Sequence, residues 1–282
     1  MDYKRKLLIV FMILIIPSLF IGCEKIDKLK VKCGFKNEDF EYIKQGKISK
    51  IAIQSTRDKG FRFIVEDKKA ISGIYDILSS GKKTNKKSTL KPDYVFEMYE
   101  NDESVHKFNY VVGIDKKNGG NLYDENNNVY LVSKRLDNDI IKNFYDITIP
   151  KNFSKVYYGS LLEVLNKYVS NLDKDETIGI DINNDVEMNK FLLSSDLEDF
   201  KSDIKSKNIK AELLEGDNKD FQVIMKITTE GYKSNLYKGI VKFLNNNNKS
   251  EKVYYIWNKY EDGNWKFNIF EDKKPKMDNK TF

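Results

Sequence analysis

The sequence contains few of the residues that build metal centres and covalent cross-links. Its 282 residues include one histidine, His106, and two cysteines, Cys23 and Cys33. A single histidine excludes zinc sites built on histidine clusters, and two cysteines exclude a cysteine-rich metal site or a disulfide framework. We therefore predict no metal and no other cofactor, and a fold held together by packed apolar cores.

Common catalytic motifs are also missing. No G-x-S-x-G elbow occurs, and the glycine–lysine run at 81–83 lacks the spacing of a phosphate-binding loop. The chain has 43 acidic residues, too many for a glycosidase-like pair to be chosen from sequence. His106 shares strand parity with Phe108 and Tyr110, which predicts that it faces the core; a lone general base is the alternative. The sequence predicts no catalytic residue.

The excess of positive charge is small. Lysine and arginine number 49 against 43 acidic residues, a net charge of +6 in a chain of which 33% is charged. A charge excess this mild and this dispersed is not that of a nucleic-acid-binding protein. We predict no nucleic-acid partner.

The one long apolar run stands at the start of the chain. Lys4, Arg5 and Lys6 precede ten unbroken apolar residues at 7–16. Residues 7–21 would make about 22 Å of helix, less than the hydrocarbon core of about 30 Å, and Pro17 interrupts them. A basic start and a short apolar core are typical of a secretory signal.

The end of this segment, Phe20-Ile21-Gly22-Cys23, resembles the lipobox of bacterial lipoproteins. The resemblance implies that residues 1–22 are a cleaved signal peptide and that the Cys23 thiol carries a diacylglycerol. The new N-terminus would then hold the protein at the extracytoplasmic face of the cell membrane, because two acyl chains give stable attachment. Cys33 would be left without a partner. Residues 23–46 are charged and weakly periodic, which predicts a tether.

Residues 47–149 have the patterns of a first α+β domain. Alternation at 51–53 and 61–65 is typical of half-buried strands. Asp67 is expected to cap a helix with an apolar stripe at positions 71, 74, 75 and 78, and Gly81 to end it in a left-handed conformation. Strands at 94–99 and 105–112 form a predicted hairpin. A strand at 129–132 and a helix over about 135–146 complete the domain.

Residues 150–282 are expected to form a second α+β domain. Pro150 marks the boundary, and 151–158 the link. Ser160 opens a predicted capping box, and Ser195 a second one for a helix at 196–205. A strand at 177–182 and a helix at 186–193 lie between them. Strands follow at 209–214, 221–228, 237–244, 252–260 and 265–270, which predicts a curved antiparallel sheet wrapped on helices.

The fold class is therefore predicted as α+β, with two small domains that each pack a mainly antiparallel sheet on helices. The segments FRFIVEDKKAISGIYDIL, PDYVFEMYE and SKRLDNDIIKNF resemble the YhfM-like domain of Firmicute lipoproteins. This resemblance covers about 47–149 and implies no established activity. The ending YYIWNKYEDGNWKFNIF is similar to the closing hairpin of cystatin-like and NTF2-like domains. Neither resemblance implies catalytic residues.

Two short acidic runs imitate the start of a calcium-binding loop. Asp181, Asn183 and Asp185 stand at its first, third and fifth places, but Val186 replaces the glycine of the sixth place and Leu192 the glutamate of the twelfth. The run at 124–128 fails at the same two places. We predict no calcium site in either run.

Two other segments are candidate binding surfaces. The loop at 82–91 is rich in lysine, as expected of a solvated loop or of a contact with lipid headgroups or teichoic acid. Its lysines are Lys82, Lys83, Lys86, Lys87 and Lys91. Aromatic residues concentrate at the end of the chain, as expected of core packing or of a groove for a peptide, glycan or partner strand. They are Tyr254, Tyr255, Trp257, Tyr260, Trp265 and Phe267.

Together these patterns predict a membrane-anchored lipoprotein of a Gram-positive-like cell envelope, acting as a non-catalytic binding or assembly module. Its partners would be the membrane, through the lipid on Cys23, and an unknown envelope protein or glycan. Two alternatives stay open: an envelope hydrolase with carboxylates in a cleft between the domains, and the solute-binding lipoprotein of a transporter. The alternating βαβ halves typical of a solute-binding protein are not visible in the pattern after residue 209.

Overall fold

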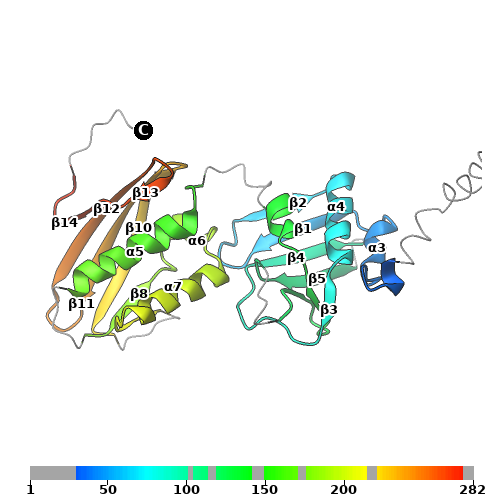
Figure 1. Ribbon diagram of the computed structural model, residues 1–282, viewed down its shortest axis with the longest axis horizontal. Coiled ribbons are helices and arrows are strands. Elements are labelled where there is room, and N and C mark those ends of the chain that lie inside the picture. The colour runs from blue at the N-terminus through cyan, green and yellow to red at the C-terminus, as the bar shows by residue number, and fades with distance from the viewer. Residues whose placement is uncertain are drawn as a thin grey trace, which may run out of the picture. The chain divides into compact units, whose positions relative to one another are not determined.

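The computed structural model describes residues 30–100, 104–113, 119–141, 149–170, 176–214 and 221–275. These residues form two compact units, each with its own sheet. Unit 1 comprises residues 30–53, 63–89 and 95–141, and unit 2 comprises residues 54–62, 90–94 and the described residues from 149 onward. The predicted α+β class with two small domains is confirmed (Figure 1).

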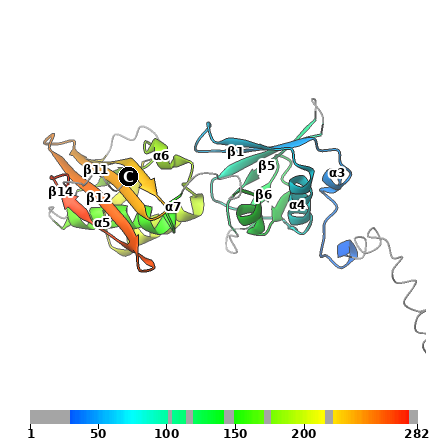
Figure 2. The same cartoon turned by 90° about the horizontal axis from the view of Figure 1, so that it is seen from above.

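Unit 1 is built on a seven-stranded sheet in the order β2-β1-β4-β5-β6-β7-β3. Its strands are β1 (Lys50–Ser55), β2 (Arg62–Val65), β3 (Lys82–Thr84), β4 (Tyr94–Tyr99), β5 (Val105–Tyr110), β6 (Leu122–Tyr123) and β7 (Val129–Leu131). The helices are α3 (Glu41–Lys44) and α4 (Lys68–Ser79), with a π-helical segment at Leu136–Ile141. Figure 2 shows α4 on one face of the sheet, and its residues Ile74 and Leu78 are fully buried.

Different contacts determine where α4 begins and where it ends. The side chain of Asp67 accepts a hydrogen bond from the Ala70 N–H at 2.9 Å, which confirms the predicted N-cap. The predicted left-handed stop at Gly81 is wrong, because Gly81 does not have a positive φ. A Cβ at Gly81 would lie 2.9 Å from Cγ1 of Val132, so close packing requires the glycine. The chain then continues directly into β3, where the sequence predicts a loop.

Residues 37–46, expected in the tether, pack onto unit 1. The Phe40 side chain is fully buried, and its ring centroid lies 5.0 Å from that of Tyr130. Nδ2 of Asn37 donates hydrogen bonds to the carbonyl oxygens of Leu78, at 3.0 Å, and Gly81, at 2.8 Å. The chain is therefore fixed to the C-terminal end of α4 from Asn37 onward.

Unit 2 contains a sheet in the order β13-β12-β11-β10-β8-β9, with β14 also paired to β12. Its strands are β8 (Ile178–Asp181), β9 (Ala211–Leu213), β10 (Val223–Lys233), β11 (Leu236–Asn245), β12 (Glu251–Glu261), β13 (Asn264–Lys266) and β14 (Ile269–Glu271), and its helices are α5 (Phe153–Val169), α6 (Val186–Asn189) and α7 (Ser194–Ser206). The strand predicted at 265–270 is therefore two short strands. β10, β11 and β12 are antiparallel, whereas β8 is parallel to both β10 and β9.

The core of unit 2 lies between α5 and the sheet. Tyr168 of α5 stacks on Phe243 of β11, with ring centroids 3.7 Å apart. α5 begins at Phe153, so the predicted link at 151–158 and the capping box at Ser160 are wrong. Ser160 is fully buried inside the helix, where its Oγ accepts a hydrogen bond from Nδ2 of Asn258 at 2.7 Å. The Ser-x-x-Glu pattern that opens at Ser160 therefore lies within α5 and does not mark the start of a helix.

The N-terminus of α7 is capped by a residue distant in sequence. The predicted box at Ser195 is wrong, because α7 begins at Ser194 without a side-chain cap of its own. The Ser194 N–H donates to Oδ1 of the buried Asp93 at 2.8 Å. Arg57 lies 3.5 Å from the same carboxylate and donates from Nε to the Leu192 carbonyl at 3.0 Å. Arg57 and Asp93 belong to the two loop segments that are part of unit 2.

Candidate binding pocket at the edge of unit 2

The edge strand β9 defines the candidate site. It pairs with β8 on one side and is the last strand of the sheet on the other. The Lys210 carbonyl accepts from the Ile178 N–H, and the Leu214 N–H donates to the Ile180 carbonyl, both at 2.9 Å. Since backbone groups alternate along a strand, those of Leu213 point to the open edge.

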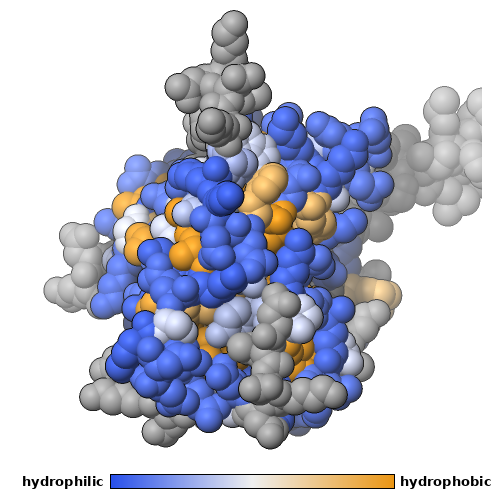
Figure 3. Space-filling model, turned by 90° about the vertical axis from the view of Figure 1, so that its left-hand side faces the viewer, coloured by the Kyte–Doolittle hydropathy of each residue, from blue (hydrophilic) through white to orange (hydrophobic). Residues whose placement is uncertain are grey.

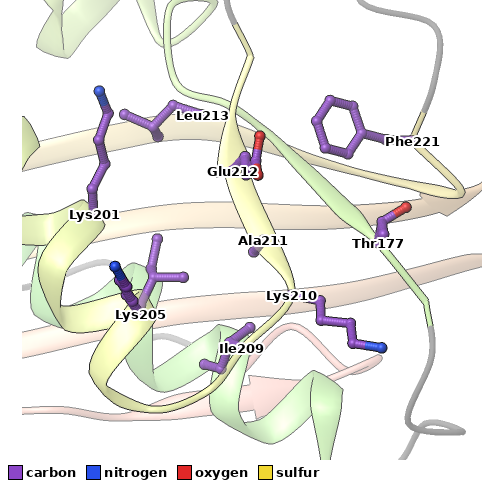
Figure 4. A pocket seen from close by; sticks show the side chains of 10 residues that line it. Thr177, Lys201, Lys205, Ile209, Lys210, Ala211, Glu212, Leu213 and Phe221 are labelled. Carbon is purple, nitrogen blue, oxygen red and sulfur yellow. The ribbon is translucent and has the colours of Figure 1, made fainter.

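A pocket of about 740 Å³ lies along this edge, between β9 and α7 (Figure 4). Its basic side chains are Lys201, Lys205 and Lys210, and its apolar lining includes Ile204, Leu213 and Phe221. The two α7 lysines stand four residues apart and therefore share one face of the helix. Ile204 on the same helix is buried and forms part of the apolar wall.

The charge of the pocket favours an anion. Its lining contains three lysines against one carboxylate among the described residues, that of Glu212. The side chains of Lys205, Lys210 and Glu212 are exposed, so solvent screens their charges. Lys201 has a partner, because its Nζ lies 2.8 Å from Oε1 of Glu198. The pocket therefore suits a ligand that joins an anionic group to an apolar part.

The described lining of the pocket contains few groups that take part in acid–base chemistry. Hydrolysis by paired carboxylates needs two acids facing one cleft, with one of them protonated near neutral pH. Among the described lining residues Glu212 is the single acid, and no histidine or cysteine is present. The described part of the pocket holds no set of side chains for acyl or glycosyl transfer.

The buried carboxylate of Asp185, in unit 2, has a structural role. It accepts hydrogen bonds from the Tyr157 hydroxyl at 2.9 Å and from the N–H and hydroxyl of Thr229 at 3.0 and 2.8 Å. Burial raises the pKa of Asp185, and these three donors oppose the rise. Both carboxylate oxygens of Asp185 thus accept hydrogen bonds, as a buried carboxylate requires.

The structure assigns local roles to both acidic runs. Asp181 accepts from Nδ2 of Asn184 at 2.6 Å, and Asp185 is engaged as above. Asp124 accepts from the backbone and side-chain amides of Asn128, both at 2.8 Å, in the turn before β7. In the described part of the chain, no three His, Cys, Asp or Glu side chains are close enough to hold a metal ion.

The aromatic residues at the end of the chain divide between core and surface. Tyr254 and Trp265 are buried, so both belong to the core. Tyr255 and Trp257 lie half-buried on the opposite face of β12, where Nζ of Lys238 is 3.9 Å from the Trp257 ring centroid. Phe267 is 37% exposed. Figure 3 shows the end of unit 2 that lies at the left of Figure 1, where apolar groups appear in several places among hydrophilic ones.

His106 is fixed by packing. Its ring stacks on that of Tyr42, with centroids 4.0 Å apart, and Nε2 lies 3.1 Å from Oε2 of Glu100. It shares its side of β5 with the buried Phe108 and Tyr110, as predicted. Burial raises the pKa of the Tyr42 hydroxyl. These contacts favour the structural interpretation of His106.

The lysine-rich segment is partly a strand. Lys82 and Lys83 belong to β3, which pairs with β7 at the edge of the sheet. Lys83 and Lys87 lie 5.7 Å and 5.2 Å from the ring centroids of Tyr130 and Tyr123. The expected loop is therefore wrong for 82–84, because backbone pairing makes these residues a strand, although the side chains of Lys82 and Lys83 are exposed.

Of the two cysteines, Cys33 is exposed, and Cys23 lies outside the described residues. No helix in the described part of the chain is long and apolar enough to cross a membrane.

The sequence did not predict the pocket along β9. The available signal was Lys201 and Lys205, spaced by one helical turn and followed by Lys210, but lysines at this spacing are common on exposed helix faces.

A protein-family model matches part of the chain. Residues 44–150 match the family model described as YhfM protein. The N-terminal domain is therefore YhfM-like, as the sequence predicts. No curated protein and no solved structure matches the chain.

Proposed function

We propose that the chain is a lipid-anchored lipoprotein at the extracytoplasmic face of the cell membrane, where it acts as a non-catalytic binding module. The observation that carries this proposal is the start of the sequence: three basic residues, a short apolar run, and Gly22-Cys23. Lipid on Cys23 makes attachment independent of a spanning helix. The remainder of the chain is then free to fold as water-soluble units.

The pocket of unit 2 supports binding as the activity. Ligand sites are concave and mostly apolar, with a few polar groups that fix orientation. Lys201, Lys205 and Lys210 supply positive charge beside an apolar wall. The ligand of this module is therefore an anionic amphiphile, with a phosphate or carboxylate at one end and an apolar group at the other.

Metabolic labelling with an alkyne fatty acid tests the anchor. The unchanged protein and Cys23→Ser are expressed in a Gram-positive host, with Cys33→Ser as the matched control. We expect label on the unchanged protein and on Cys33→Ser, and none on Cys23→Ser. Equal labelling of the Cys23→Ser variant would refute the assignment.

Calorimetric titration of the mature chain tests the pocket. The probe is dodecyl phosphate below its micelle concentration, compared with dodecyltrimethylammonium and inorganic phosphate. Combined Lys201→Gln, Lys205→Gln and Lys210→Gln substitutions are expected to weaken dodecyl phosphate binding by about threefold to a hundredfold, since each exposed charge pair contributes about 0.2–1 kcal/mol. Replacing the exposed Lys155, Lys207 and Lys226 by Gln is the control. Equal affinity for the cationic probe would contradict the proposed ligand class.

A further inference from the structure

We propose that four lysines of unit 1 dock against the anionic lipid surface of the membrane that holds the chain. These residues, Lys82, Lys83, Lys86 and Lys87, are here called the lysine edge, and all four are exposed. The inference rests on the proposed lipid anchor and adds to it a second, electrostatic contact. It assigns the segment to the lipid surface and not to a protein partner.

Hydrogen bonds and close packing hold the backbone of the lysine edge in place. β3 is paired with β7, and two hydrogen bonds hold the segment after it to Gly120: the Gly120 N–H donates to the Lys86 carbonyl at 2.7 Å, and the Ser88 N–H donates to the Gly120 carbonyl at 2.8 Å. A Cβ at Gly119 would lie 2.2 Å from the Lys86 carbonyl oxygen. The backbone that carries the four lysines is thus held in place by hydrogen bonds and close packing.

The charge of the lysine edge is incompletely balanced. Nζ of Lys83 lies 3.5 Å from Oδ1 of the partly exposed Asp39. Within the described residues, Lys82, Lys86 and Lys87 form no ion pair with a carboxylate. The edge therefore keeps an excess of positive charge, which attracts anionic lipid headgroups over about one Debye length.

The course of the chain places this edge near the anchor. The Asn37 N–H donates to the Ser79 carbonyl at 2.7 Å, and its side chain donates to the Gly81 carbonyl at 2.8 Å. Gly81 directly precedes β3. From Cys23 to Asn37 the chain advances 14 residues, which span at most about 50 Å. The anchored chain therefore joins unit 1 beside the lysine edge, within reach of the bilayer.

Vesicle co-sedimentation tests the proposal. The protein used is the mature chain with Cys23→Ser, which carries no lipid. Its binding to vesicles therefore depends on the lysine edge and not on the anchor. A failure of this assay is thus distinguishable from a failure of the labelling experiment, which tests the anchor. The vesicles are phosphatidylcholine, with or without phosphatidylglycerol. We expect binding that requires phosphatidylglycerol and weakens with added salt.

The matched variants separate the edge from net charge. Each lysine near an anionic surface strengthens binding about fivefold. Changing Lys82, Lys83, Lys86 and Lys87 to Gln removes four such contributions and is therefore expected to weaken binding by about 600-fold. The control changes Lys155, Lys207, Lys226 and Lys249, which are also exposed, and it removes the same charge from unit 2.

Circular dichroism checks that both variants fold. Lysines on an edge strand also deter pairing with other strands, and that role alone predicts no dependence on lipid charge. Equal loss in the two variants, or equal binding to neutral vesicles, would overturn the proposal.

Discussion

Two glycine-to-alanine changes in unit 1 should have opposite effects on stability. At Gly120, an added Cβ would lie 2.5 Å from Cγ1 of Val129, 2.7 Å from the Tyr130 carbonyl oxygen and 2.8 Å from Cγ2 of Thr84. The backbone oxygen cannot rotate away, so the segment must move. At Gly73, inside α4, nothing lies within 4 Å of the added atom.

The magnitudes follow from these contacts. Forcing an extra carbon into a packed site costs about 1–3 kcal/mol. A shift at Gly120 also weakens its two hydrogen bonds to the segment at 86–88, which contribute about 0.5–1.5 kcal/mol each. We expect Gly120→Ala to lower the free energy of unfolding by about 3 kcal/mol or more. Gly73→Ala should raise it by about 0.5–1 kcal/mol, because alanine is the better helix former.

Hydrogen-exchange mass spectrometry with urea unfolding measures both effects. Peptides covering 82–88 and 119–131 should lose protection in Gly120→Ala and keep it in Gly73→Ala. Urea unfolding followed by circular dichroism gives the free energies. If Gly120→Ala proves as stable as the unchanged protein, with protection intact at 82–88, the packing described for these residues is wrong.

Two further predictions concern α7. Burial, followed by the charges of Asp199 and Asp93, raises the pKa of Asp196 to about 6. Protonation of this carboxyl therefore favours the folded state, and the free energy of unfolding should rise as the pH falls through 6 towards 4. Asp196→Asn should raise the free energy of unfolding by about 1 kcal/mol at pH 7, allowing for solvent screening. Urea titrations at several pH values should also show a weaker dependence of this free energy on pH, and an unchanged dependence would contradict the prediction. Asp93→Ala leaves Arg57 without this carboxylate and should cost about 3 kcal/mol, whereas the exposed Asp203→Ala should cost under about 0.5 kcal/mol. Thermal unfolding of both variants checks this, and equal losses would refute it.

Local rules sufficed where the contacts that fix an element are near in sequence. Asp67 caps α4 through a residue three positions away, and the alternation in β4 and β10 is that of strands with one buried face. The α+β class and the meander after residue 221 follow from such patterns, because side-chain periodicity is itself a local property.

Prediction failed where a distant residue decides. Ser160 has the pattern of a helix start, yet Asn258, from the other end of the unit, buries it inside α5. Asp93 replaces a local cap for α7 across a sequence separation of 101 residues. β3 exists because β7 pairs with it. The pocket along β9 needs the fold to bring Phe221 and side chains of α7 into one lining, and no local pattern contains that information.

The central claim is that a lipid on Cys23 holds the protein to the membrane, and the intact mass of the protein extracted from the membrane tests it most directly. The account predicts a chain that begins at Cys23 and carries the added mass of a diacylglycerol group. A chain that still begins at Met1, or one that begins at Cys23 with a free thiol, would contradict it.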